Sequence, residues 1–155
     1  MSWGSPCART AWAARVLALG LVAVAGGPAS AQERPEVPFE VTVVYVSPEA
    51  GGVQDDPQAR QIDRLLGAKL RYERLEVLES VRRRVGLNEI ESLNLPTGKR
   101  FRFRPLDVGP HGVLVAVDLE TTAQGDFRIP PGKPLILGGQ PYRDGQLVVV
   151  LEVGD

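Results

Sequence analysis

The chain has 155 residues with 18 basic and 19 acidic side chains, so its near-neutral charge gives no long-range attraction to nucleic acid. A single cysteine, Cys7, excludes a disulfide within the chain, and a single histidine, His111, excludes a metal site built from several histidines. Because Cys7 lies in the segment expected to be removed as a signal peptide, the mature chain is also expected to lack a Cys–His catalytic pair. The composition therefore predicts no cofactor and no nucleic-acid partner.

Residues 1–31 predict a secretory signal peptide. Arg9 and Arg15 give this segment a positive start without acidic residues, and a short apolar run and an A-x-A site ending at Ala31 follow. The apolar run is about half of the roughly twenty residues needed to cross a hydrocarbon core. We therefore expect Sec-type cleavage before Gln32, a mature protein in the periplasm or outside the cell, and no membrane span after cleavage.

The first part of the mature chain predicts one strand and one helix. Residues 32–38 are polar with two prolines and predict an exposed lead, whereas Phe39–Val46 alternates as a strand does. Asp56 followed by Pro57 is typical of a helix start, because Asp accepts from free N–H groups and Pro loses no hydrogen bond there. Apolar residues at helical spacing predict one amphipathic helix over 57–70.

Residues 72–85 fit two interpretations. Leu75, Val77 and Val85 share a face at strand period, but Leu75 and Val85 also fit a helix that ends at Gly86. Glutamate and arginine favour the helix, and the valines favour the strand. The strand is predicted because the rest of the chain is β and one helix already covers a sheet face.

Short segments separated by turn residues fill the rest of the chain. Strands are expected at 90–95, 100–104, 113–120, 127–129, 135–137 and 147–153, with loops at 121–126 and 138–145. This spacing is typical of an antiparallel sandwich or small barrel. The sequence thus predicts a single β-rich domain over 39–155, of the α+β class, mainly antiparallel β with one amphipathic helix.

Arginines provide a candidate binding surface. Arg100, Arg102 and Arg104 share the outward face of one predicted strand, and Arg82 and Arg84 would extend this face if they lay on a neighbouring strand. Such a surface could bind phosphate, an acidic glycan or an acidic protein. The more ordinary interpretation is a solvated face paired with nearby carboxylates, namely Glu76, Glu79, Glu89 and Glu91.

Catalytic patterns are weaker. His111 lies in a Pro-His-Gly turn, and no serine lies in a nucleophile-elbow sequence. Asp55 and Asp56 could bind a hard cation with Glu49 or Asp63, but the spacing matches no calcium loop and Asp56 is explained as a helix cap. A carboxylate pair of the glycosidase type cannot be located among nineteen acidic residues.

The stretch Gly132-Lys133-Pro134-Leu135-Ile136-Leu137-Gly138-Gly139 predicts an apolar strand opened by a turn and closed by a glycine pair. Together with Thr97-Gly98-Lys99, Phe101-Arg102-Phe103 and the alternating strand that begins at Gly112, residues 98–139 resemble strands near the C-terminal end of the bacterial secretin core. The mature chain is too short for a whole secretin. The resemblance therefore implies a periplasmic accessory or relic module that pairs with envelope machinery.

The functional expectation is a non-catalytic interaction module of the cell envelope with a protein partner. An edge strand such as Leu147–Val153 would take up a partner strand by β-addition. The loop Tyr142-Arg143-Asp144 and the arginine face are the expected binding surfaces. Two alternatives are left open: a periplasmic binding domain for an anionic glycan or lipid headgroup, and a small hydrolase.

Overall fold

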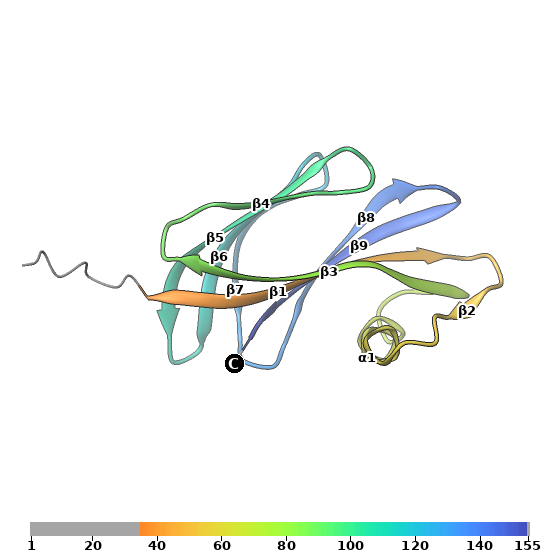
Figure 1. The fold of residues 1–155 in the computed structure, drawn as a ribbon, viewed down its shortest axis with the longest axis horizontal. Helices are drawn as coiled ribbons and strands as arrows, with labels where there is room; N and C mark the ends of the chain where they lie inside the picture. Colours follow the sequence, from red (N-terminus) through yellow and green to blue (C-terminus); the bar gives the residue numbers. More distant parts are fainter. Residues whose placement is uncertain (1–34, 155) are drawn as a thin grey trace, which may run out of the picture. The chain divides into compact units, whose positions relative to one another are not determined.

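Strand β1 lies in the middle of the larger of two β-sheets (Figure 1). The computed structural model describes residues 35–154, and the predicted signal peptide, residues 1–31, lies outside them. The elements of the described part are, in chain order, β1 (Glu36–Ser47), β2 (Gly52–Val53), α1 (Pro57–Leu66), β3 (Arg74–Gly86), β4 (Glu91–Asn94), β5 (Arg100–Gly109), β6 (Gly112–Leu119), β7 (Ala123–Ile129), β8 (Leu135–Tyr142) and β9 (Gly145–Val153).

The strands form two separate sheets. The larger sheet has the order β2-β3-β1-β9-β8, and the smaller sheet has the order β4-β5-β6-β7. All pairs are antiparallel except β2 with β3, which are parallel at Gly52 and Val53. With one helix packed on the larger sheet, the structure confirms the predicted α+β class, and the two sheets match the sandwich alternative.

A hydrophobic core fills the space between the two sheets. Phe39 of β1 and Phe103 of β5 are 2% and 1% exposed, and their rings meet edge to face with centroids 5.1 Å apart. Phe101 stacks on Phe103 at 5.5 Å, so both phenylalanines of β5 point inward, as expected. Burial of one such side chain stabilises the fold by about 1.5–3 kcal/mol, and this cluster therefore holds the sheets together.

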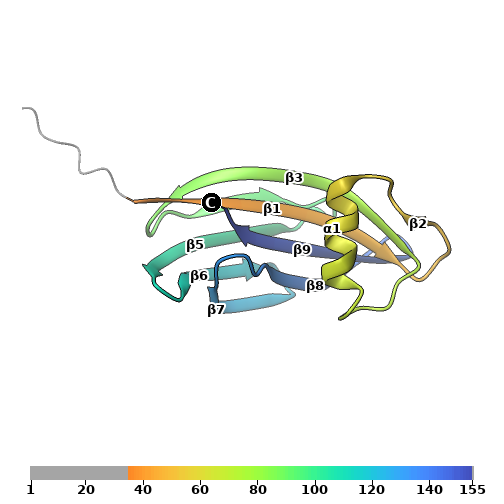
Figure 2. The ribbon, with the colours of Figure 1, turned by 90° about the horizontal axis from the view of Figure 1, so that it is seen from below.

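A second cluster lies on the other face of the larger sheet, under α1. Ala59, Ile62 and Leu66 of the helix pack with Val44 of β1 and Val148 of β9. Figure 2 shows the helix crossing the strands of this sheet. Because neighbouring residues of a strand point to opposite faces, β1 contributes to both clusters, which explains why the consecutive residues Val43–Val46 are all apolar or aromatic and buried.

The start of α1 follows the prediction. The Asp56 carboxylate accepts hydrogen bonds from the backbone N–H of Gln58 at 2.8 Å and of Ala59 at 3.1 Å, and Pro57 occupies the first turn. These bonds satisfy donors that have no partner within the helix.

The end of α1 comes earlier than expected. The helix ends at Leu66 with Gly67 as its cap, not at residue 70, because glycine is a poor helix former. Leu70 nevertheless packs against the second cluster from the turn that follows, which explains why it fits the helical stripe. Among residues 35–154 no helix is both long and apolar enough to cross a membrane.

The ambiguous segment 72–85 is the strand β3, which confirms the prediction. It pairs with β1 from Glu36↔Gly86 to Ser47↔Arg74, and this pairing outweighs the helix propensity of its charged residues. The same pairing makes part of the expected exposed lead, residues 32–38, into strand. Val37, for example, is only 4% exposed.

Two expected loops are largely strand. Most of residues 121–126 belongs to β7, which pairs with β6 from Leu119↔Ala123 to Val113↔Ile129. Much of 138–145 belongs to β8, which continues to Tyr142 through an irregularity between Gly138 and Gln140. The small inward residues of β7 and the glycine pair of β8 hide the strand pattern in the sequence.

Strand β9 corrects another expectation. Leu147–Val153 was proposed as an edge strand for β-addition, but β9 pairs with β1 on one side and with β8 on the other. Both of its edges are occupied. The edge of this half of the sheet is β8.

Candidate functional site

The predicted arginine face lies on the outer surface of the smaller sheet. Arg100, Arg102 and Arg104 are exposed on β5. Arg82 and Arg84 do not extend this face, because they belong to β3 in the other sheet. Strand order is set by the tertiary fold, so the sequence could not show this separation.

Carboxylates already occupy part of the arginine face. Arg102 forms an ion pair with Asp118 of β6, which is not among the acidic partners expected from the sequence. The backbone N–H of Arg100 donates to Glu120 at 3.0 Å. Arg104 has no ion-pair partner in the described part of the chain, and it lines a shallow hollow of about 490 Å³.

The predicted loop Tyr142-Arg143-Asp144 spans the end of β8 and the tight turn into β9. The guanidinium of Arg143 lies over the rings of Tyr142, at 5.0 Å, and Tyr45, at 5.6 Å. Asp144 accepts hydrogen bonds from the hydroxyls of Tyr45 and Ser47, the latter at 3.1 Å. The turn is thus bonded to the end of β1, and its side chains have a structural role.

A pair of carboxyl groups lies beside this turn. Hydrogen bonds from Tyr45 and from Glu49 lower the pKa of Asp144 to about 2, and the bond to Asp144 raises the pKa of Glu49. Pairs with diverging pKa values occur in acid–base catalysis. Here the small groove next to the turn, of about 160 Å³, is lined by Ser47 and Gly145, and neither carboxyl is among its lining residues.

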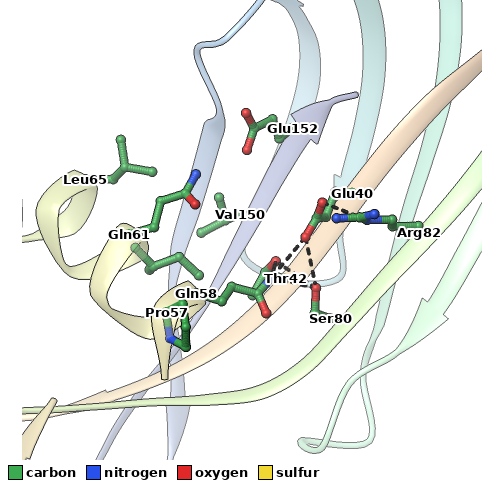
Figure 3. A pocket seen from close by; sticks show the side chains of 11 residues that line it. Glu40, Thr42, Pro57, Gln58, Gln61, Leu65, Ser80, Arg82, Val150 and Glu152 are labelled. Carbon is green, nitrogen blue, oxygen red and sulfur yellow. Dashed lines mark hydrogen bonds and ion pairs between the residues drawn. The ribbon is translucent and has the colours of Figure 1, made fainter. Parts of the chain in front are cut away.

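A polar groove of about 540 Å³ lies between α1 and the strands β1, β3 and β9 of the larger sheet (Figure 3). The Nε2 atom of Gln58 lies 3.0 Å from Glu40, 3.2 Å from Thr42 and 2.7 Å from Ser80. Arg82 donates to the same glutamate at 3.1 Å. These hydrogen bonds tie the helix to the sheet, whereas Gln61 and Glu152, which also line the groove, make no hydrogen bond or ion pair among the residues drawn.

A different groove lies along the edge of β8. It measures about 530 Å³, and its lining residues come from β8, from the turn after α1 and from β9: Lys69, Leu70, Pro134, Leu135, Ile136, Gly138, Gly139 and Gln146. One edge of β8 pairs with β9, and no described strand pairs with its other edge. The backbone groups on that edge are therefore available to another chain.

The wall of this groove is held in place by hydrogen bonds. Tyr72 donates to the Asp63 carboxylate of α1 at 2.8 Å, and burial and this bond raise the pKa of Tyr72. The backbone N–H of Lys69 and of Leu70 each donate to Leu66 at 2.8 Å. The segment that follows α1 is thus fixed relative to the helix.

The β8 edge differs from the other edges by its charge. β8 contains no charged residue, whereas the free part of β3 carries Arg82 to Arg84, β4 carries Glu91, and β7 carries Asp126 and Arg128. Charged side chains on an edge oppose pairing with a second chain. On β8 two features interrupt the regular strand: the irregularity at Gly139, and Pro141. The backbone of Leu135–Gly138 is therefore left available on the unpaired edge.

The sequence did not identify this edge, because it could not show that β8 rather than β9 is outermost. A signal was nevertheless present, since the predicted strand 135–137 has no charged residue, whereas the predicted strands 127–129 and 147–153 each contain one. Among residues 35–154, no three His, Cys, Asp or Glu side chains are close enough to hold a metal ion.

Comparisons with known proteins found no relative of this chain. The chain matches no protein family, no curated protein and no solved structure.

Proposed function

We propose that this chain is a non-catalytic interaction module of the cell envelope that binds an extended segment of a partner protein by adding it to the edge of β8. The observation that carries this proposal is the uncharged, unpaired segment Leu135–Gly138 beside a groove of about 530 Å³. Main-chain hydrogen bonds would supply affinity, and the groove would hold alternate side chains of the added strand.

The lack of charged residues supports the choice of this edge. A long apolar edge exposes a protein to aggregation, and natural sheets block such edges with charge, proline or bulges. Three edges of the described sheets carry charged residues, whereas Leu135–Gly138 carries none. Pro141 and the irregularity after Gly138 protect the end of β8, and a partner strand that covers Leu135–Gly138 accounts for the missing charge on the rest.

The partner is assigned to the envelope on two sequence arguments. The predicted signal peptide, residues 1–31, would export the chain to the periplasm or beyond. The stretch Gly132–Gly139, which carries part of the resemblance to the secretin core, contains the same residues that form the open edge of β8. Both arguments favour a periplasmic module that pairs with envelope machinery.

In-cell photocrosslinking tests this proposal. The full chain, produced in a Gram-negative host, carries a photocrosslinking residue in place of Lys69, on the groove wall. Gly138→Lys places a charge on the open edge, and the added Cβ would contact Val148 at an ordinary 3.5 Å. Gln124→Lys, on the exposed face of the edge strand β7, is the matched control.

The expected result is a crosslink to another protein that Gly138→Lys removes and Gln124→Lys preserves. A crosslink that survives Gly138→Lys would contradict β-addition at β8. A crosslink only to a second copy of this chain would reassign the edge to a homodimer.

A second candidate function, binding of an anionic glycan or lipid headgroup, is supported by one observation. Arg104 lines the hollow on the smaller sheet without an ion-pair partner in the described residues. The test is sedimentation with phosphatidylglycerol vesicles at low and high salt. Binding that persists in the double variant Arg102→Ala, Arg104→Ala would contradict this function.

A further inference from the structure

The groove along β8 has features that select the chemistry of an added strand. Ile136 and Gly138 lie on the same face of β8, because side chains alternate along a strand. Ile136 is half-buried against the cluster under α1, and Leu70 flanks it in the groove. The wall next to Gly138 is therefore apolar.

The space above the glycine pair is open. A Cβ atom placed on Gly138 would meet only the side chain of Val148, at 3.5 Å or more, and a Cβ atom placed on Gly139 would have no atom within 4 Å. Gly139 has φ +103°, a conformation that favours glycine, so this position stays without a side chain. A depression in the edge strand results.

A large ring on the partner strand would fill this depression. In an antiparallel pair, the Cβ atoms of directly opposite residues lie about 4.5–5.5 Å apart. An aromatic residue opposite a glycine covers the exposed backbone, and here it would also contact Ile136 and Leu70. Aromatic side chains bury more area than any other, which makes this the main anchor of the strand.

The positive charge of Lys69 favours a second feature of the added strand. Lys69 is the one charged residue among those that line the groove, and it has no ion-pair partner in the described part of the chain. Lys133 lies two residues before the strand, from which Pro134 separates it. A carboxylate on the partner within reach of Lys69 would neutralise its charge, whereas a lysine there would be repelled.

We infer that the β8 groove selects an extended segment with an aromatic residue opposite Gly138 and an acidic residue within reach of Lys69. This inference rests on the proposed function, since it describes the strand that β8 takes up. It adds a specificity that β-addition alone does not require.

The test uses the purified full chain and a matched set of short, labelled Thr/Val peptides. The reference peptide has Phe in the middle and Asp on the same face two residues away, and its variants replace Phe by Ala or Asp by Lys. Fluorescence anisotropy gives each Kd. The Phe→Ala peptide should bind about tenfold more weakly, and the Asp→Lys peptide about threefold more weakly at low salt.

A charge-reversed protein provides the sharper control. Lys69→Glu should invert the preference, so that the Lys peptide binds more tightly than the Asp peptide. The half-exposed residue Lys99 directly precedes β5 of the smaller sheet and is not among the residues that line the groove, so Lys99→Glu should leave the preference unchanged.

The outcomes separate the two claims. If all peptides bind alike, and Gly138→Lys still blocks them, the selectivity is wrong while β-addition at β8 stands. Binding that Gly138→Lys does not reduce would count against both. If none of the peptides binds, the inferred selectivity is overturned, and crosslinking remains the separate test of the proposed function.

Discussion

Tyr45 donates a hydrogen bond from its hydroxyl to Asp144, which lies 99 residues later in the sequence. Tyr45 is 1% exposed, so its ring belongs to the core while its hydroxyl reaches the turn between β8 and β9. Ser47 donates to the other oxygen of the same carboxylate. This contact fixes the hairpin that carries the proposed binding edge to the end of β1.

The first prediction concerns the stability of the fold at low pH. The pKa of Asp144 is lowered to about 2 from 3.8, chiefly by the hydrogen bond from Tyr45, so folding favours the ionised form. The stability from this group is fully present above the unfolded value and is lost as pH falls from about 4 to about 2. Urea unfolding across this range should show the loss, and Asp144→Asn should lack this component.

The pKa of the neighbouring glutamate, Glu49, shifts in the opposite direction. The pKa of Glu49 is raised, chiefly by its hydrogen bond to Asp144, so the contribution of this group is present at low pH and is lost as pH rises. Glu49→Gln keeps a donor at every pH and should preserve the acid-dependent loss due to Asp144. If Asp144→Asn unfolds with the same acid dependence as the native chain, the assignment is wrong.

The second prediction concerns the turn between β5 and β6. Gly112 has φ +111°, and an added Cβ would lie 2.1 Å from the backbone oxygen of Ile129, so Gly112→Ala forces the β6–β7 pair apart. We expect a loss of at least about 2 kcal/mol. Gly98 also has positive φ, but an added Cβ would meet nothing within 4 Å, so Gly98→Ala should cost only about 1 kcal/mol. Equal losses in thermal or urea unfolding would contradict the role of the close approach.

The third prediction concerns the helix. Leu66, the last residue of α1, is fully buried against the larger sheet, and Leu66→Ala should destabilise the chain by about 2–5 kcal/mol. Leu65 is half-buried at the rim of the polar groove, and Leu65→Ala should cost about 1 kcal/mol. Urea denaturation followed by circular dichroism compares the two. A larger effect at Leu65 would mean that the helix is rotated from the described orientation.

The fourth prediction concerns the arginine face. Arg102 and Asp118 form an exposed ion pair, and such pairs contribute about 0–1 kcal/mol. Arg102→Ala should therefore change the free energy of unfolding by less than about 1 kcal/mol at low salt, with a smaller effect at high salt. A larger change would show that Arg102 is part of a network that stabilises the sheet.

Local signals explain what the sequence predicted well. Asp56 and Pro57 mark a helix start through their own chemistry, and alternation in Phe39–Val46 reports a strand with one face on the core. The class and most strands followed from such signals. Residues 127–129 of β7 were predicted as strand, but its first part was expected as a loop. Ala123 and Gly125 occupy inward positions there, and these small residues give no apolar alternation.

Long-range order explains what the sequence could not predict. Arg102 and Arg104 were correctly expected to be exposed, but nothing local to Arg82 and Arg84 shows that they belong to another sheet. The position of β9 between β1 and β8 is likewise a property of the whole fold. The choice of the binding edge depends on this order, so it required the structure.

The pairing of β1 with β9 also bears on how the chain folds. The larger sheet cannot close until its last strand is available, because β9 completes the middle of the sheet from Phe39↔Val153 to Val46↔Gln146. Contacts this distant in sequence slow folding, typically to the range of milliseconds to seconds for β-rich domains. The larger sheet is therefore expected to form only after β9 has been made, and a chain that lacks β9 should leave β1 with only β3 as a partner.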